Sequence, residues 1–329
     1  MQTDNRKLKI KLKMRILFMG TSEFALPALR ELITHRFEII GVVTQPDRPS
    51  GRGKRLNPPP VKIVATEHSL PVYQPEKVRK PDFMSVLERL APDVIVVAAF
   101  GQLLPQTLLD IPPGGTINLH PSLLPKYRGA APIQWALING ETETGVTLML
   151  LDAGEDTGDI ISTSCIRIRN EDNAFTLTEQ LAQLGANQLV RLLSEMPEGA
   201  PPPATPQNNA EATHAPRLTK EIGHIDWNQP ATTIHNLVRG TAIWPGAYTF
   251  FRNNLRLKIV ECLPLSQTLD APSGALEIVE KRKLFVATAD GMLQLLKIQP
   301  ATKKAMEASD FINGYQVQTG EQLLAATSL

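Results

Sequence analysis

The first part of the chain alternates short apolar runs with amphipathic segments, and this alternation constrains the fold more than any other feature. The apolar runs are found at residues 15–19, 38–44, 93–100, 116–120 and 147–151. The amphipathic segments that predict helices are found at residues 25–34, 132–139 and 175–193. Continuous apolar runs are typical of strands that are buried on both faces of a parallel sheet. Strands that alternate with helices therefore predict a doubly wound α/β domain over residues 14–196.

The composition changes after this domain. Residues 197–216 contain six prolines and show no hydrophobic periodicity, so we expect a semi-rigid linker. Residues 231–241 then have the pattern of a helix. Short strand-like runs follow, separated by turn sequences such as Asn253-Asn254. Several short strands at this spacing predict a small C-terminal β-barrel domain over residues 217–329.

The net charge of the chain is close to zero. The 329 residues include 34 Lys and Arg against 33 Asp and Glu, so a nucleic-acid partner must meet a local basic patch. Residues 1–13 are basic, and we expect them to form a disordered leader. A basic arm that contacts RNA and a transit peptide are the alternatives. No apolar stretch reaches the roughly 18 residues that span a bilayer, so no membrane partner is expected.

The few cysteines and tryptophans carry weaker signals. Cys165 and Cys262 cannot form a disulfide framework or a four-cysteine metal site, and they suit a reducing compartment. We expect both to be small core residues. Trp227 and Trp244 are likewise predicted to lie in the core rather than to stack on bases.

Asn118 and His120 are the first candidate catalytic residues. They lie two positions apart at the end of an apolar run, so the alternation of a strand points both side chains to one face. Open α/β sheets bind ligands at the carboxyl ends of their strands, where this pair is expected. An amide and an imidazole side by side can both donate to one developing oxyanion. A buried structural histidine is the alternative.

A loop rich in carboxylates follows the next apolar run. Residues 152–159 hold four carboxylates and two glycines, and we expect them at the carboxyl end of a neighbouring strand. One carboxylate would then approach His120 and keep its imidazole protonated. A metal site formed by Asp152, Asp156 and Asp159 is the alternative, but the spacing does not match a calcium loop, and no metal is expected. Asn, His and Asp together predict direct acyl transfer to an amine.

Residues 45–60 form a basic segment in which seven of the sixteen residues are Pro or Gly. Its basic residues are Arg48, Arg52, Lys54 and Arg55. So long a segment between a strand and a helix predicts an unstructured insertion. It would act as a flexible arm that contacts nucleic-acid phosphate and orders on binding. A solvated surface loop is the alternative.

Several longer motifs resemble the methionyl-tRNA formyltransferase family. They are Gly20-Thr-Ser-Glu-Phe, Thr44-Gln-Pro-Asp-Arg-Pro, Gly51-Arg-Gly-Lys-Arg-Leu, Asn118-x-His120 with Ser122-Leu-Leu-Pro125, Arg128-Gly-Ala-Ala-Pro-Ile-Gln134, Asp156-Thr-Gly-Asp159, Ile225-Asp-Trp227, Trp244-Pro-Gly-Ala-Tyr248 and Gln299-Pro-Ala-Thr-Lys-Lys304. The match runs in order from about Met14 nearly to the C-terminus. Enzymes that move a formyl group from 10-formyltetrahydrofolate share the Asn-x-His…Asp set. Among these enzymes, the basic segment and the second domain resemble those of the methionyl-tRNA formyltransferases.

The resemblance implies a Rossmann-like formyltransferase domain followed by an oligonucleotide-binding-like β-barrel that binds tRNA. It implies a cytoplasmic, monomeric transferase of translation initiation, which moves formyl from 10-formyltetrahydrofolate to the α-amine of methionine on initiator tRNA. The donor would be a co-substrate, so no tightly bound cofactor is implied. The catalytic residues would be Asn118, His120 and Asp156. The folate-binding residues would be Ser122, Leu123, Leu124 and Pro125, beside the loop at 152–159, and the tRNA-binding residues would be Arg48, Arg52, Lys54 and Arg55.

Other functions share parts of this pattern. A formyltransferase for an amino-sugar nucleotide and a formyltetrahydrofolate hydrolase share the Asn-x-His…Asp set, but the basic segment argues against both. An inert RNA-binding protein with the same fold would not need the intact set. A nicotinamide-dependent redox enzyme is not expected, because Gly20 is followed by no further glycine at dinucleotide spacing.

Overall fold

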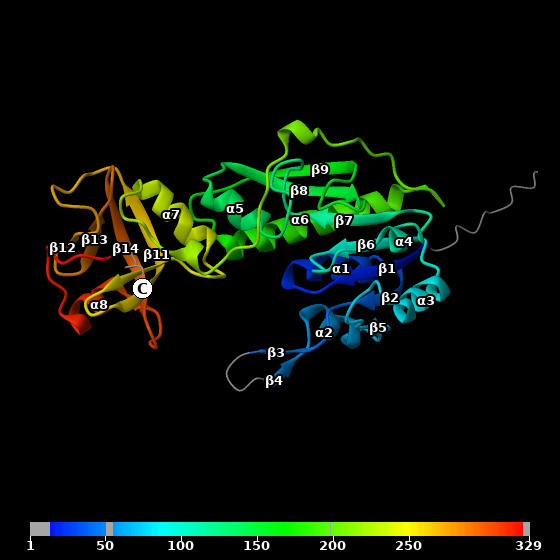
Figure 1. Cartoon of the computed structure of the whole chain (residues 1–329), viewed down its shortest axis with the longest axis horizontal. Coiled ribbons are helices and arrows are strands. Elements are labelled where there is room, and N and C mark those ends of the chain that lie inside the picture. Colours follow the sequence, from blue (N-terminus) through cyan, green and yellow to red (C-terminus); the bar gives the residue numbers. More distant parts are fainter. Residues whose placement is uncertain (1–13, 51–54, 198, 325–329) are drawn as a thin grey trace, which may run out of the picture. The chain divides into compact units, whose positions relative to one another are not determined.

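The computed structural model describes residues 14–50, 55–197 and 199–324, in two compact units (Figure 1). The basic leader at residues 1–13 and the residues Arg52 and Lys54 therefore lie outside the described residues. The first unit comprises the chain up to Leu124 together with Val146–Ser164 and Leu181–Asn209. The second unit comprises Pro125–Gly145, Cys165–Gln180 and the chain from Ala210 onward.

A seven-stranded sheet with the order β5-β2-β1-β6-β7-β8-β9 organises the first unit (Figure 1). Its strands are β1 (Arg15–Gly20), β2 (Glu38–Val43), β5 (Val72–Tyr73), β6 (Val94–Ala98), β7 (Thr116–His120), β8 (Glu143–Leu150) and β9 (Ile160–Arg167). Strands β5, β2, β1, β6 and β7 are parallel. The central strand β6 is buried along its whole length, because helices cover both faces of the sheet.

Helices pack on opposite faces of the parallel strands. They are α1 (Leu26–Thr34), α2 (Pro60–Glu67), α3 (Pro81–Leu90), α4 (Gln106–Leu109) and α6 (Ala174–Glu195). Phe83 and Leu87 of α3 share a core cluster with Ile95 of β6. Gly185 of α6 approaches Leu119 of β7, which points to the other face. The side chains next to Leu119 along β7 therefore face the side of α3.

The direction of β8 differs from the predicted parallel arrangement. β8 pairs with β7 antiparallel, with His120 opposite Thr147. The predicted helix between these strands exists as α5 (Pro132–Ile138), but it belongs to the second unit, where it packs against α7 (Ala231–Gly240). Parallel neighbours need a crossover connection, which α5 does not provide. The chain therefore returns to the sheet in the opposite direction, and β9 extends the sheet beyond β8.

Short antiparallel strands form the sheet of the second unit, in the order β10-β11-β14-β13-β12 with β15 beside β14. The elements are β10 (Tyr248–Phe251), β11 (Leu255–Leu265), β12 (Leu276–Val279), β13 (Lys283–Ala287), β14 (Met292–Pro300), β15 (Met306–Glu307) and α8 (Ala308–Tyr315). Backbone bridges join Leu324 to Phe250 of β10 and Gln322 to Ala275 beside β12. The last described residues therefore link the two outer strands. Helices α7 and α8 contribute to the core of this unit.

The predicted fold class is confirmed: a Rossmann-like domain with a parallel sheet precedes a C-terminal domain of antiparallel strands. Two predicted core residues are exposed instead. Cys262 is buried, but Cys165 lies on the exposed side of β9. Trp227 is buried at 3% exposure, whereas Trp244, in the turn between α7 and β10, is 46% exposed. Hydrophobicity alone does not show which side of an edge strand or a turn faces water.

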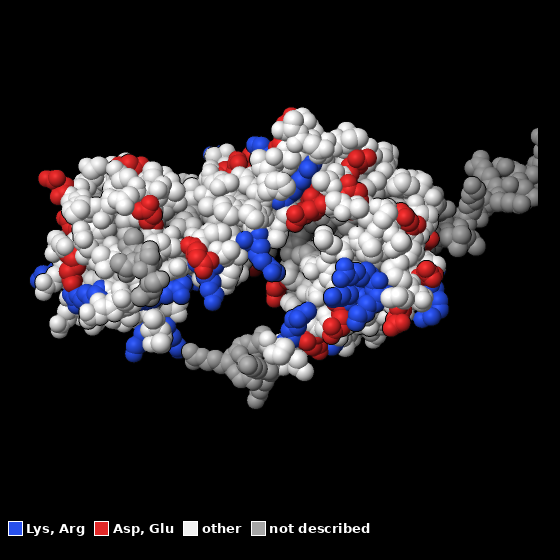
Figure 2. Space-filling view, viewed as in Figure 1, with Lys and Arg blue, Asp and Glu red and all other residues white. Residues whose placement is uncertain are grey.

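The surface carries charges of both signs. Figure 2 shows both basic and acidic side chains on the face in view. Among the residues that the structure describes, no helix is long and apolar enough to cross a membrane.

Candidate active site

Strand β7 ends in the candidate catalytic pair. Asn118 and His120 are 8% and 4% exposed, and the alternation of the strand places them on the face opposite to Leu119. Because β7 ends at His120, the imidazole lies at the carboxyl edge of the parallel strands. Open α/β sheets bind their ligands at this edge.

A carboxylate from a distant loop faces this imidazole. Nδ1 of His120 lies 3.5 Å from Oδ2 of Asp156, and the two side chains are only 5% and 15% exposed. Opposite charges attract more strongly in such a shielded site than at a wet surface. At this distance the Asp156 carboxylate is placed to fix the orientation of the imidazole ring.

The loop around Asp156 has an unusual backbone. Asp156 has a φ of +53°, and the left-handed region costs an L-residue about 1–2 kcal/mol, so neighbouring contacts must hold it there. Oδ1 of Asp152 accepts hydrogen bonds from the Gly154 N–H at 3.0 Å and the Thr157 hydroxyl at 2.7 Å. A Cβ at Gly158 would collide with the backbone of the preceding strand. The absence of a side chain at Gly158 therefore allows the loop to pack against β8.

Asp156 reaches His120 by a different route from the predicted one. Because β8 is antiparallel to β7, it ends at Leu150 opposite Ile117, at the other end of β7. Ile117 and His120 are about 10 Å apart along a strand, so the loop at 152–159 must fold back along the sheet. Within the described part of the chain, no group of three or more His, Cys, Asp or Glu side chains could hold a metal ion.

The predicted folate-binding residues form the turn after β7. Ser122 and Leu124 are buried, whereas Leu123 and Pro125 are partly exposed. Thr147 of β8 braces this turn: its Oγ1 donates to the Ser122 carbonyl oxygen at 2.7 Å and accepts the Leu124 N–H at 3.1 Å. Sequence reasoning misses Thr147. A polar residue inside an apolar run was the available signal.

The basic segment contains a hairpin and is not a wholly unstructured insertion. β3 (Arg48–Ser50) pairs antiparallel with β4 (Arg55–Asn57), and Figure 1 shows both strands extending beside α2. Asp47 anchors the base, since its carboxylate accepts hydrogen bonds from Gln74 Nε2 at 2.7 Å and from Lys62 Nζ at 2.9 and 2.8 Å. These two partners, Gln74 first, lower the pKa of Asp47. Backbone pairing needs no hydrophobic periodicity, so the sequence pattern does not indicate the hairpin.

The predicted tRNA-binding residues belong to this hairpin. Arg48 begins β3 and is exposed, and Arg55 begins β4. Arg52 and Lys54 stand between the two strands in the sequence, outside the described residues. The structure therefore gives the ends of the basic segment a defined backbone.

The hairpin starts from the edge of the sheet that carries His120. The Thr21 hydroxyl donates to the Phe100 carbonyl oxygen at 2.9 Å, and Gln45 Nε2 donates to the same oxygen at 3.2 Å. Thr21 follows β1, Gln45 follows β2 and Phe100 follows β6. The loops at the carboxyl ends of three parallel strands are thus tied together at the base of the hairpin.

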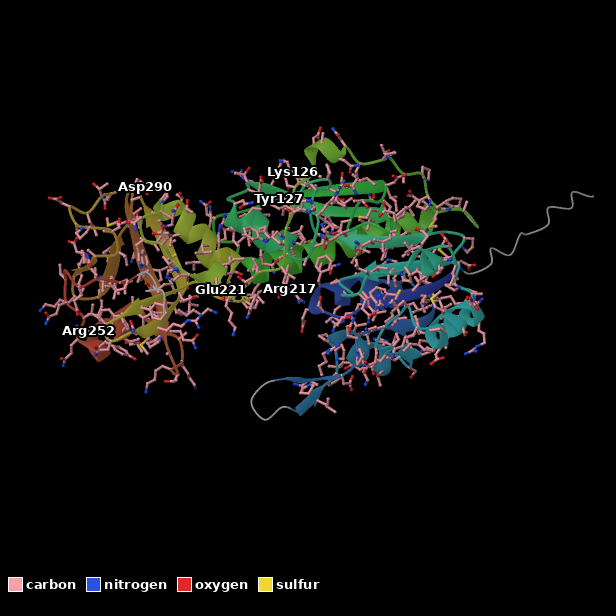
Figure 3. The ribbon with its side chains drawn as sticks, viewed as in Figure 1. Lys126, Tyr127, Arg217, Glu221, Arg252 and Asp290 are labelled. Carbon is pink, nitrogen blue, oxygen red and sulfur yellow. The ribbon has the colours of Figure 1, made fainter. Side chains whose placement is uncertain are left out.

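Tyr127, labelled in Figure 3, organises the segment that leads to α5 in the second unit. Its hydroxyl donates to Glu141 at 2.6 Å and accepts from the Asn139 amide at 3.2 Å. Burial, and then the adjacent Glu141, raise the pKa of Tyr127 to about 12. The phenol therefore remains a hydrogen-bond donor at neutral pH, and this network holds the turn at its φ of +60°.

Solved structures share this fold. The sugar 3N-formyl transferase WlaRD, crystallised with dTDP and 5-N-formyl-THF, matches with a TM-score of 0.64 at 19% identity, over 89% of this chain and 99% of that one. HypX from Aquifex aeolicus, in complex with tetrahydrofolic acid, matches with a TM-score of 0.59 at 18% identity, over 94% of this chain and 49% of that one.

Similarity in sequence is much higher to one family. The family model described as "Formyl transferase" matches residues 13–193 of this chain. The model described as "Formyl transferase, C-terminal domain" matches residues 217–316. The methionyl-tRNA formyltransferase of Syntrophus aciditrophicus is 47% identical over 94% of this chain and 99% of its own length. That of Thermodesulfovibrio yellowstonii is 48% identical over 93% of this chain and 97% of its own length. With relatives this similar over nearly their whole length, the chain belongs to the methionyl-tRNA formyltransferase family.

Proposed function

We propose that this formyltransferase moves the formyl group of 10-formyltetrahydrofolate to the α-amine of methionine on initiator tRNA. The observation that carries the proposal is the 3.5 Å approach of Asp156 to His120 at the end of β7, in a chain of this family. The product would be the formyl-methionyl-tRNA used in translation initiation. The donor is consumed in each turnover and is therefore a co-substrate.

Three residues would act on one tetrahedral intermediate. The amine attacks the formyl carbon, a C–N bond forms, and the formyl oxygen becomes an oxyanion. The Asn118 amide and the His120 imidazolium donate hydrogen bonds to this oxyanion, where negative charge develops. Asp156 stabilises the imidazolium and passes the amine proton toward N10 of the folate. N10 leaves with that proton as its bond to the formyl carbon breaks.

The turn after β7 would form part of the folate site. Ser122, Leu123, Leu124 and Pro125 follow His120 directly, and the loop at 152–159 would complete the lining. Support comes from the two hydrogen bonds of Thr147, which keep the turn rigid. A rigid wall beside the reacting atoms holds the donor in a productive geometry.

The hairpin would contact the phosphates of the tRNA. Its proposed contact residues are Arg48, Arg52, Lys54 and Arg55. Two observations support this role: the hairpin starts beside the edge that carries His120, and Asp47 fixes its base. Because the whole chain is nearly neutral, binding of a polyanion requires such a local cluster.

The C-terminal domain, residues 217–329 after the linker at 197–216, would bind the tRNA as well. Trp244 is exposed, and the Arg256 guanidinium stacks 3.9 Å above the ring of Tyr248. Exposed aromatic rings and stacked arginines are side chains that contact RNA bases and backbone. We also propose a monomer that works in the cytoplasm, where the two unpaired cysteines would stay reduced.

The direct test mixes the purified protein with 10-formyltetrahydrofolate and methionine-charged initiator tRNA. Charged elongator tRNA and an amino-sugar nucleotide serve as parallel acceptors. Formyl-methionine on the initiator tRNA alone supports the donor, the acceptor and the selectivity together. If the folate is turned over but neither tRNA is formylated, the assignment of the catalytic residues stands and the tRNA is rejected as the acceptor. Formylation of the sugar nucleotide would identify the alternative substrate.

A further inference from the structure

We propose that Gln207 is a positioning residue that holds Asp156 in the orientation needed for formyl transfer, a role that rests on the proposed function of Asp156. Nε2 of Gln207 donates to the backbone carbonyl oxygen of Asp156 at 2.8 Å and to that of Gly158 at 2.7 Å. One side-chain amide thus uses both of its N–H groups on a single turn of the loop. Gln207 itself belongs to a separate segment of the chain, about 50 residues after the loop.

The backbone next to Gln207 is itself paired with the start of β9. Thr205 and Ile160 exchange two backbone hydrogen bonds of 2.8 Å each in an antiparallel bridge. Because the bridge is antiparallel, the residue two positions after Thr205, Gln207, lies opposite the residue two positions before Ile160, Gly158. The reach of the Gln207 amide to the loop therefore follows from backbone pairing and does not depend on a chance side-chain conformation.

The loop needs support on this side because of the backbone of Asp156. Its φ of +53° lies in a region that L-residues leave unless other contacts hold them. Asp152 holds the loop from within through Gly154 and Thr157, whereas Gln207 binds the carbonyl of Asp156 itself. Loss of the Gln207 amide would free that peptide group to turn. The carboxylate that faces His120 at 3.5 Å would then move with it.

The first experiment compares Gln207→Ala with Gln207→Asn in steady-state formylation of charged initiator tRNA. Asparagine keeps an amide but is one methylene too short to reach both carbonyls. We expect kcat to fall about 10- to 100-fold in both variants, because a displaced catalytic group costs rate. KM for the tRNA should stay within about 2-fold, because no tRNA contact is removed. Gln183→Ala, which truncates an exposed glutamine of the same unit, is the matched control.

The second experiment is a double-mutant cycle with Asp156→Asn. If Gln207 acts through Asp156, Gln207→Ala should cause no further loss of kcat once the carboxylate has been removed. An equal loss in both backgrounds, or wild-type kcat in the two single Gln207 variants, would overturn the positioning role alone. Full activity of Asp156→Asn would instead reject the proposed role of Asp156. Thermal unfolding of each variant checks that it folds. If Gln207→Ala does not fold, the double-mutant cycle is run with Gln207→Asn instead.

Discussion

The Asp156 carboxylate lies 3.5 Å from Nδ1 of His120, although its loop begins opposite the far end of β7. The pair is therefore made by a loop that folds back along the sheet, and strand pairing alone does not bring the two groups together. Its geometry depends on Asp152 inside the loop and on the left-handed backbone of Asp156. Changes in this loop should affect the chemistry more than the stability of the protein.

Replacement of Asp156 by asparagine should lower kcat by about 100- to 1,000-fold, because the charge that stabilises the imidazolium is removed. Rapid-quench measurement of formyl-methionyl-tRNA checks this rate. The matched control is Glu155→Gln, which neutralises the adjacent, exposed carboxylate and should keep the rate nearly unchanged. Near-normal turnover of Asp156→Asn would contradict the assignment.

Arg52→Ala should weaken formylation of charged tRNA while leaving slow hydrolysis of the folate donor unchanged. The expected cause is the loss of one phosphate contact, which reduces the slope of log affinity against log salt concentration by about 1. Filter binding of the tRNA at several salt concentrations measures the slope. Arg30→Ala removes an exposed arginine of α1 and is the control. Equal slopes for the Arg52 and Arg30 variants would exclude a phosphate contact at Arg52.

Asp290→Ala should lower the free energy of unfolding of the second unit by about 1 kcal/mol. The Asp290 carboxylate accepts the N–H of Ala231 at 2.9 Å, at the start of α7, where the preceding residue Pro230 provides no side-chain cap. Figure 3 labels Asp290. Urea unfolding followed by circular dichroism measures the effect, with Asp270→Ala, at an exposed turn, as the control. Equal losses in both variants would argue against a capping role.

The second unit should lose stability as the pH falls below about 6.5. Burial, and then Arg239, lower the pKa of His235 from its ordinary value of 6.5, while its Nδ1 donates to the Cys262 carbonyl oxygen at 3.1 Å. In this range the unfolded chain binds the proton first, so protonation favours unfolding. Above that pH both states are neutral and the contribution is constant. Melting temperatures across this range should fall less for His235→Asn than for the unaltered protein, and an unchanged slope would remove His235 as the cause.

Local sequence patterns predicted the elements and the candidate residues of the site. The apolar run at 93–100 became β6 (Val94–Ala98), and the alternation around Leu119 placed Asn118 and His120 on one face. These features depend on neighbours within a few positions of each other, and their periodicity is therefore visible in the chain. The longer motifs added the family, which the relatives at 45–48% identity confirm.

The tertiary structure decided what links distant segments. The direction of β8, the pairing of β3 with β4, and the exposure of Trp244 leave no periodic signal in the sequence. The approach of Asp156 to His120 requires a loop to fold back along a strand, and Gln207, from a separate segment, donates hydrogen bonds to the backbone of that loop. Such contacts gain their free energy only when remote segments pack together, so they exist in the folded chain and in no single stretch of it.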